Sequence, residues 1–148
     1  QYSDMVRRLC VVHLKNYADT EDVFQTVFLK YAFSSVPFES KEHEKAWFIR
    51  VTVNACKDLL KSFFGKKTVS MEEISMIIGK NDVESNFIIQ AVSSLPDKYK
   101  EVVYLYYYEG YSAVEIGEIL HKNVNTVYTL LSRAKQMLKN QLGDEFIE

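Results

Sequence analysis

The spacing of polar and apolar residues between positions 112 and 135 constrains the fold of this chain more than any other feature. Ser112 and Glu115 stand three residues apart, as in a capping box, and predict that a helix begins there. A turn is expected at 121–123, because His121 and Asn123 tolerate a left-handed backbone better than most residues do. A second helix follows, since apolar residues return at helical spacing at Val124, Val127, Leu130, Leu131 and Ala134. The segment therefore predicts a helix-turn-helix.

The second helix of this segment would present a polar outer face, which suits the major groove of duplex DNA. Gly117, on the first helix, is small where the second helix would have to approach closely. The residues expected on the outer face are Asn125, Thr126, Tyr128, Thr129, Ser132, Arg133 and Lys135. An ordinary helical hairpin in an all-helical domain gives the same pattern, so the segment alone leaves both interpretations open.

Composition limits how such a chain could bind DNA. With 148 residues, 47% of them hydrophobic, the chain can bury a core as one domain or as two small ones. Its formal net charge is only −2, so any DNA contact must come from local patches rather than from a general positive field. Cys10 and Cys56 lie within helical patterns and are expected to be buried free thiols, which indicates a reducing, cytoplasmic location.

The sequence holds no pattern typical of a catalytic site or of a membrane span. It lacks a glycine-rich phosphate loop, a cluster of metal ligands and a nucleophile with a base beside it. His13 has no second ligand at metal spacing and is expected to be a packed or edge residue. No apolar run is long enough to cross a bilayer. We therefore predict a protein that is not an enzyme, with no catalytic residue, metal, cofactor or membrane span.

Helical periodicity runs through nearly the whole chain, and alternating strand patterns are absent. The predicted fold class is all-α, with two small helical domains joined by a linker and a helix-turn-helix in the C-terminal one. The expected boundaries are 1–64 for the first domain, 65–83 for the linker and 84–148 for the second domain. Asp19 or Thr20 is expected to cap the second helix, and the helix that begins near Lys41 is expected to reach Phe64.

One strip of the expected helix at 41–64 combines an aromatic ring, an amide and three cations. Its members fall at offsets of three, seven, ten and fourteen, and are Trp47, Arg50, Asn54, Lys57 and Lys61. Such a strip suits unpaired nucleic acid, with a base stacked on the tryptophan and phosphates along the cations. A solvated helix face that ends in a core tryptophan is the alternative, and the pattern does not exclude it.

Four segments of the chain together match the pattern of a known protein family. The first domain carries TEDVFQTVFLKYA at 20–32 and KAWFIRVTVNACKDLLKS at 45–62. The second domain carries LPDKYKEVVYLYYYEGYSAVEIGEIL at 95–120 and TVYTLLSRAKQML at 126–138. In these segments the chain resembles the extracytoplasmic-function (ECF) sigma factors, small bacterial initiation subunits that consist of sigma regions 2 and 4. The four occur in the family's order with its linker gap between them, so the resemblance covers nearly the whole chain.

The resemblance implies a role for each surface. The helix that carries Asp19, Glu21, Asp22, Gln25 and Phe28 would dock on the coiled coil of the polymerase's largest clamp subunit. The strip from Trp47 to Lys61 would open and read the minus-10 promoter element as a single strand. The outer face at 125–135 would read the minus-35 element in the major groove. The implied partners are core RNA polymerase, promoter DNA and an anti-sigma factor.

The chain departs from the family pattern after Val127. The family usually places Lys, Ser, Arg and Leu there, whereas this chain has Tyr128, Thr129, Leu130 and Leu131. Residues 95–148 carry six Lys and Arg against eight Asp and Glu, so phosphate contacts are few and upstream reading is expected to be weak or unusual. The departure motivates an alternative function, a sigma-like interaction module that binds polymerase or another protein without reading a promoter alone.

Overall fold

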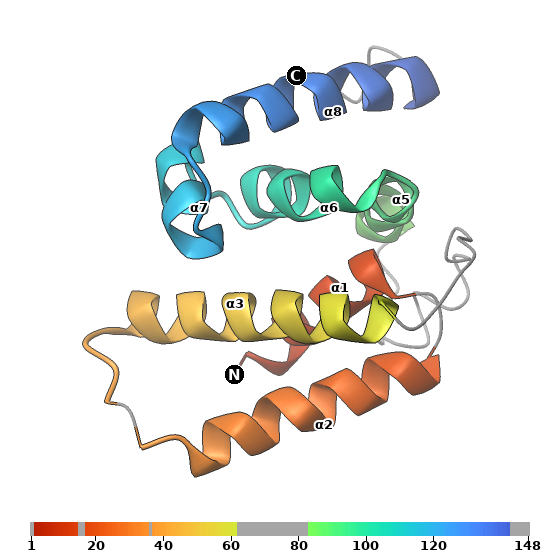
Figure 1. Cartoon of the computed structure of the whole chain (residues 1–148). Helices are drawn as coiled ribbons and strands as arrows, with labels where there is room; N and C mark the ends of the chain where they lie inside the picture. Colours follow the sequence, from red (N-terminus) through yellow and green to blue (C-terminus); the bar gives the residue numbers. More distant parts are fainter. Residues whose placement is uncertain (1, 15–16, 36, 62–82, 143–148) are drawn as a thin grey trace.

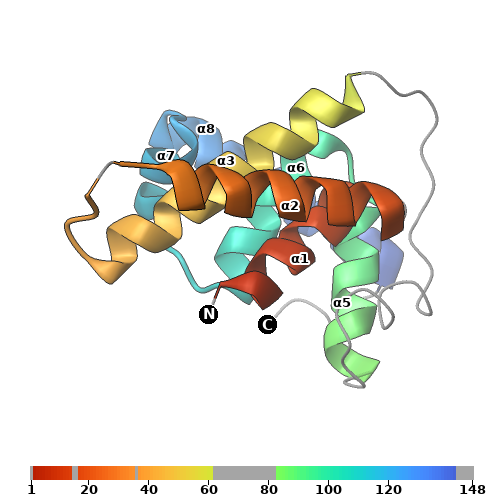
Figure 2. The same cartoon turned by 90° about the horizontal axis from the view of Figure 1, so that it is seen from below.

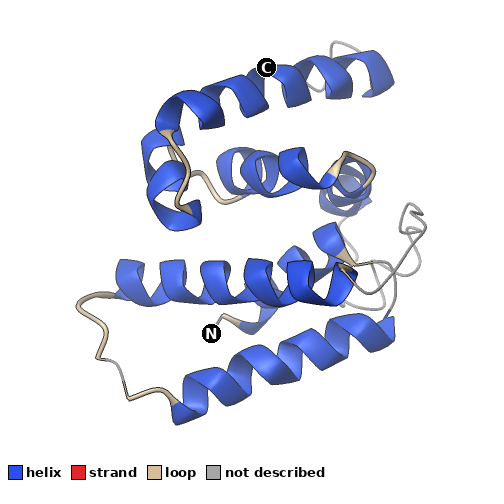
Figure 3. Cartoon of the chain, in the orientation of Figure 1, coloured by secondary structure: helices blue, strands red, loops and turns tan. Residues whose placement is uncertain are grey.

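The computed structural model describes residues 2–14, 17–35, 37–61 and 83–142, and every regular element within them is a helix (Figure 3). The all-α prediction is therefore confirmed for these residues. The elements are α1 (Ser3–His13), α2 (Tyr17–Phe33), α3 (Lys41–Leu60), α5 (Val83–Ser93), α6 (Asp97–Val103), the π-helical turn η1 (Tyr104–Tyr108), α7 (Ala113–Leu120) and α8 (Val124–Leu142).

Helices α1, α2 and α3 pack together around aromatic rings. The Phe48 ring lies at the centre, with centroid distances of 4.9 Å to Tyr2, 5.2 Å to Phe28 and 4.8 Å to Tyr31. Ser40 starts α3, because its hydroxyl accepts a hydrogen bond of 3.1 Å from the backbone N–H of His43. Tilted ring pairs at these distances stabilise the packing beyond what the burial of their apolar area contributes.

The C-terminal half of helix α1 is buried on all sides rather than on one face, whereas Asp4 near its start is exposed. Val6, Leu9, Cys10, Val11 and Val12 have no exposed surface. The reason is its position, because α1 contacts α2 and α3 on one side and α5 and α6 on the other (Figures 1 and 2). The second half of the chain therefore completes the burial of the first helix.

The second half begins with α5 and continues through α6 directly into η1. Pro96 precedes the first residue of α6 and is its N-cap. Within η1 the hydrogen bonds reach five residues back, as in the 3.2 Å bond from the backbone N–H of Glu109 to the Tyr104 carbonyl. Gly110 then turns the chain at a φ of 82°, and α7 and α8 lie over the α6 side of the molecule (Figure 1).

Several expected element boundaries differ from the structure. Helix α2 begins at Tyr17, so Asp19 lies in its first turn and Thr20 is buried within it; the prediction that either residue caps the helix is wrong. Helix α3 ends at Leu60, and the residues expected to continue it to Phe64 lie mostly outside the described part of the chain. Nearly all of the expected linker at 65–83 is also outside it.

Both cysteines are free thiols and both are buried, as predicted. Cys10 on α1 and Cys56 on α3 have no exposed surface. A hydrogen bond with Cys10 and burial together raise the pKa of Cys56 well above its ordinary value. The two thiols therefore act as packing groups between these helices.

Candidate nucleic-acid and polymerase interfaces

The strip on α3 divides into an aromatic half and an open polar half. Trp47 and Arg50 are half-buried, whereas Asn54, Lys57 and Lys61 are exposed. The open half offers an amide and two ammonium groups on one helix face. A strand of nucleic acid could reach Asn54 and Lys61 without any change in the fold, whereas Lys57 is already paired with a carboxylate.

Trp47 belongs to an aromatic cluster at the start of α3. Its ring lies 5.8 Å from Phe38 in an edge contact and 5.9 Å from Tyr31, measured between centroids. Phe38 also stacks on Tyr31 at 6.1 Å, and the Tyr31 hydroxyl donates a 2.5 Å hydrogen bond to Glu44. The tryptophan is thus neither a fully solvated residue nor a buried core residue. Its partners Tyr31 and Phe38 were not recognised from the sequence, although Phe38 is a lone aromatic in the loop that precedes α3.

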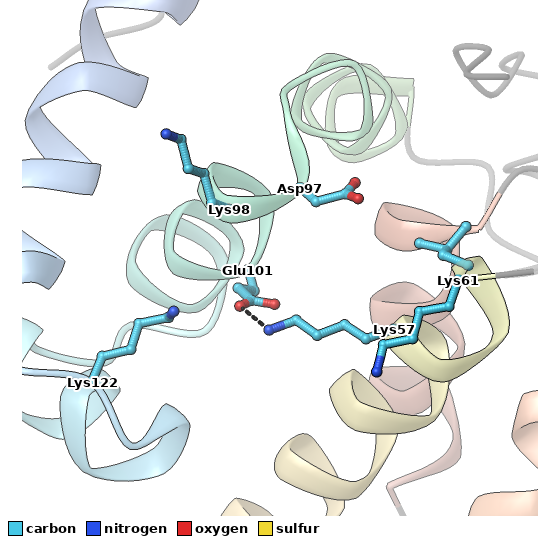
Figure 4. Close-up of a pocket in the computed structure, with 7 residues that line it drawn as sticks. Lys57, Lys61, Asp97, Lys98, Glu101 and Lys122 are labelled. Carbon is cyan, nitrogen blue, oxygen red and sulfur yellow. Dashed lines mark ion pairs between the residues drawn. The ribbon is translucent and has the colours of Figure 1, made fainter. Parts of the chain in front are cut away.

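Lys57 is engaged by a carboxylate from the second half of the chain. Its Nζ lies 3.0 Å from Oε2 of Glu101 on α6, and Figure 4 shows this ion pair spanning the gap between α3 and α6. The other oxygen of Glu101 lies 3.2 Å from Nε2 of His13, whose Nδ1 lies 3.1 Å from the Leu9 carbonyl oxygen. Both ring nitrogens of His13 thus lie within hydrogen-bond distance of an oxygen atom. The packed role predicted for His13 is confirmed, since it is fully buried.

Glu101 is ionised despite its burial. It has no exposed surface, and burial by itself would raise the pKa of a carboxyl group. The hydrogen bonds and charges of His13 and Lys57 outweigh that effect, so the pKa of Glu101 is lowered. A buried charge of this kind is stable only while its partners stay in place.

Glu109, which follows η1, makes a second contact of the same type. Its carboxylate lies 3.5 Å from Arg8 on α1 and 3.2 Å from Lys45 on α3, and it accepts a 2.6 Å hydrogen bond from the Tyr104 hydroxyl. Burial alone would raise its pKa, but the hydrogen bonds from Tyr104 and Lys45 and the charge of Arg8 lower it overall. Neither Glu101 nor Glu109 was singled out from the sequence, because nothing local marks a residue whose partners are about 50 to 100 positions away.

The helix-turn-helix has the local geometry that its sequence predicts. Ser112 and Glu115 form both bonds of the capping box, at 2.9 and 3.1 Å. His121 adopts the left-handed conformation, with φ 57° and ψ 47°. At Gly117 a Cβ atom would stand 2.7 Å from the Lys122 carbonyl oxygen and 3.8 Å from Cα of Val124. The backbone that approaches Gly117 most closely is thus that of the turn, at Lys122, rather than that of the second helix.

The N-terminal half of α8 presents the face expected for reading DNA. The side chains exposed there are Asn125, Thr126, Tyr128, Thr129, Ser132, Arg133 and Lys135. The Asn123 side chain begins the helix by accepting a 2.8 Å hydrogen bond from the backbone N–H of Asn125. Leu130, where the family places a cation, is only 7% exposed and belongs to the core. Of the two missing cations, only the one replaced by Tyr128 would have lain on the exposed face of α8.

Helix α2 offers an exposed face that extends beyond the residues singled out from the sequence. Asp22 and Gln25 are exposed, and Leu29 and Phe33 continue their strip at helical spacing, with Phe33 84% exposed. Glu21 instead pairs with Arg7 of α1 at 3.3 Å, and Phe28 packs on Phe24 and Phe48. Asp19 is half-buried. A docking face built on α2 thus contains two large apolar side chains that were missed.

Within the described residues, no group of three or more His, Cys, Asp or Glu side chains could hold a metal ion. None of the helices described is long and apolar enough to cross a membrane.

Comparison with known proteins identifies two conserved regions of one protein class. The family model of sigma-70 region 2 matches residues 1–62, and that of sigma-70 region 4 matches residues 88–138. The chain is 29% identical to the ECF RNA polymerase sigma factor SigW of Bacillus subtilis, over 97% of this chain and 86% of that protein. It is 31% identical to the RNA polymerase sigma factor SigV of the same organism, over 93% of this chain and 84% of that protein.

The fold is also similar to a solved sigma factor. The sigma factor RpoE of Bartonella quintana, crystallised with the anti-sigma factor NepR, matches 96% of this chain and 92% of its own, with a TM-score of 0.69 and 16% identity. The chain therefore belongs to the ECF sigma factors. Its function is to direct the initiation of transcription, and the alternative of an interaction module that reads no promoter is not favoured.

Proposed function

We propose that the chain binds core RNA polymerase through α2 and reads promoter DNA through α3 and α8. The single observation that carries this proposal is the strip on α3, where a supported tryptophan adjoins an exposed amide and exposed lysines. Unpaired bases stack on aromatic rings, and their phosphates bind cations. We assign Trp47, Arg50, Asn54, Lys57 and Lys61 to the minus-10 element.

The outer face of α8 is proposed to contact the minus-35 element in the major groove. The exposed hydroxyl and amide groups of Asn125, Thr126 and Ser132 can bond to base edges. The Thr129 hydroxyl donates a 3.0 Å hydrogen bond to the Asn125 carbonyl and can still accept one. Arg133 and Lys135 supply the positive charge for phosphates. Tyr128 adds an exposed ring but no charge, which supports weak upstream binding.

The polymerase-docking surface is proposed to be the exposed strip Asp22, Gln25, Leu29 and Phe33 on α2. Its carboxylate and amide suit a basic, polar helical partner, and its apolar end supplies area to bury on binding. Asp19 lies beside this strip in the first turn of α2. Glu21 and Phe28 support the face indirectly, because one pairs with Arg7 and the other packs on Phe48.

Three further expectations accompany this proposal. The division into a region 2 domain at 1–64 and a region 4 domain at 84–148 is supported by the two family-model matches. An anti-sigma factor is proposed as a regulatory partner, since the structural relative was crystallised with one. The protein is proposed to act in the cytoplasm, where RNA polymerase works, without catalysing a reaction of its own.

Co-elution with purified bacterial core RNA polymerase on a sizing column tests the docking surface. The wild-type chain is expected to bind stoichiometrically, and Asp22→Lys combined with Phe33→Ala is expected to abolish binding. Glu118→Lys is the matched control, because it makes the same charge change at an exposed position on α7. Failure of the wild type to co-elute, with helicity confirmed by circular dichroism, would overturn the proposal.

Promoter melting tests the strip. Asn54 is exposed, so Asn54→Ala is expected to leave folding and polymerase binding intact while open-complex formation falls. Asp58→Ala, at another exposed position of α3, serves as the control. Normal melting by the Asn54 variant would remove this residue from the proposed site.

A further inference from the structure

The two halves of the chain are joined by two carboxylates that are bound in the same way. Glu101 on α6 contacts His13 of α1 and Lys57 of α3. Glu109, after η1, contacts Arg8 of α1 and Lys45 of α3. Each carboxylate thus takes one partner from α1 and one from α3, although Lys45 and Lys57 lie about 18 Å apart along the helix.

We propose that Glu101 and Glu109 form a two-point latch that holds residues 83–142 closed on α1 and α3, and that Glu101 occupies Lys57 in place of a DNA phosphate. The inference rests on the proposed function of the α3 strip and adds an internal competitor to it. The carboxylate oxygen lies 3.0 Å from the Lys57 ammonium, at the distance of a charge-assisted bond. A phosphate oxygen cannot take that place while Glu101 holds it.

The burial of the latch shows why it depends on closure. Glu101 has no exposed surface, and the Glu109 side chain is 9% exposed. If α6 moved away from α1 and α3, both carboxylates would lose the cations that compensate their desolvation and would have to be solvated by water instead. The ionic contacts and the apolar burial of α1 therefore favour the same closed arrangement.

Lys57 is the member of the strip at which closure and DNA binding compete. Its side chain remains 44% exposed, so the pair with Glu101 is partly solvated and can be exchanged for a stronger polyanion. The cavity beside the pair, about 360 Å³ in volume, is lined by Lys61, Lys98 and Lys122 and by one further carboxylate, that of Asp97. A nucleic-acid backbone that entered this gap would therefore meet cations from both halves of the chain.

The test measures closure and DNA binding separately in the full chain. Spin labels at Lys41→Cys and Gln136→Cys, both exposed positions, report the distance between α3 and α8 in the absence of DNA. Binding of a fluorescent single-stranded oligonucleotide with the sequence of a minus-10 element, at fixed salt, reports access to the strip. Glu101→Gln removes the charge with little change in shape, and Glu118→Gln on α7 is the matched control.

Glu101→Gln is expected to shift the label distances to longer values and to raise single-strand affinity roughly two- to fivefold, the range of a partly exposed ion pair. The Glu118→Gln variant should match the wild type in both measurements. Distances and affinity that both stay at the control values would overturn the proposal. Separated labels without a gain in affinity would overturn the competition at Lys57 while the latch stands.

A second variant keeps the latch testable if Glu101→Gln fails to fold. Lys45→Met removes the half-exposed partner of Glu109 on α3 and lies outside the proposed strip. Lys45→Met is expected to shift the distance between the two spin labels to longer values, as Glu101→Gln does. If the labels separate but the wild type binds no single strand at all, the proposed function of the strip fails and the latch does not.

Discussion

The two proposed DNA-reading helices, α3 and α8, obtain their surfaces in different ways. Helix α3 runs from Lys41 to Leu60 and carries its aromatic ring and its cations as side chains on one strip. Helix α8 carries few charges in its exposed first half, and its placement depends on the turn between Gly117 and Val124. Helix α3 therefore depends on side-chain chemistry, and helix α8 depends on backbone geometry. Removing a side chain should damage the first, and changing the turn should damage the second.

The largest effect is expected from the aromatic group of α3. Trp47→Ala should weaken binding of a single-stranded minus-10 oligonucleotide about thirtyfold, because stacking on an aromatic ring contributes about 2 kcal/mol per base. Fluorescence anisotropy would measure the affinity, and thermal melting would show whether the variant remains folded. Trp47→Phe is the control for lost packing, since it keeps a ring beside Phe38. A loss of affinity in Trp47→Ala that only follows a loss of folded protein in thermal melting would show that the cluster is structural only.

The next largest effect is expected at the turn that positions α8. Gly117→Ala should destabilise the helix-turn-helix by about 2 kcal/mol, because the added Cβ would meet the Lys122 carbonyl at 2.7 Å. Urea denaturation would measure the free energy of unfolding, and duplex binding should fall with it. Ala113→Gly, on the same helix, is a control for propensity alone. A neutral Gly117 variant would contradict the view that backbone geometry limits this element.

A smaller effect is expected from adding charge to α8. Tyr128→Lys should raise affinity for duplex promoter DNA about threefold and steepen its salt dependence by roughly one phosphate contact. Met137→Lys adds the same charge at the far, exposed part of the helix and should change neither property. Leu130→Arg is not equivalent, since Leu130 is buried and an arginine there would disturb the core. Equal gains at positions 128 and 137 would indicate a nonspecific charge effect.

The smallest effect is expected at His121. A residue other than glycine at a φ of 57° is strained, so His121→Gly should stabilise the fold by about 0.5 kcal/mol. The free energy of unfolding measures this change, and DNA affinity should stay constant. His121→Ala should fail to stabilise, because alanine keeps the Cβ atom. Stabilisation by alanine as well would show that the imidazole, rather than the backbone, causes the strain.

The sequence was sufficient to predict those features that local chemistry determines. The capping box at Ser112, the left-handed turn at His121 and the outer face of α8 follow from residues close together in the chain. The burial of the C-terminal half of α1 on every side and the pairing of Glu101 and Glu109 did not follow, because their partners lie far away in sequence. The start of α2 was misjudged for a related reason, since Thr20 is held by tertiary packing inside the helix rather than at its end.

The π-helical turn at Tyr104–Tyr108 sets the rotational position of Glu109 relative to helix α6. It uses one residue more per turn than the α-helix before it, and Glu109 comes directly after it. Deleting one residue there would leave a regular helix but would rotate every later residue by about 100° about the axis. Glu109 would then point away from Arg8 and Lys45. The number of residues in this turn therefore matters more than their identity. Substitution of the exposed Tyr106 or Tyr107 should be tolerated far better than deletion of either residue.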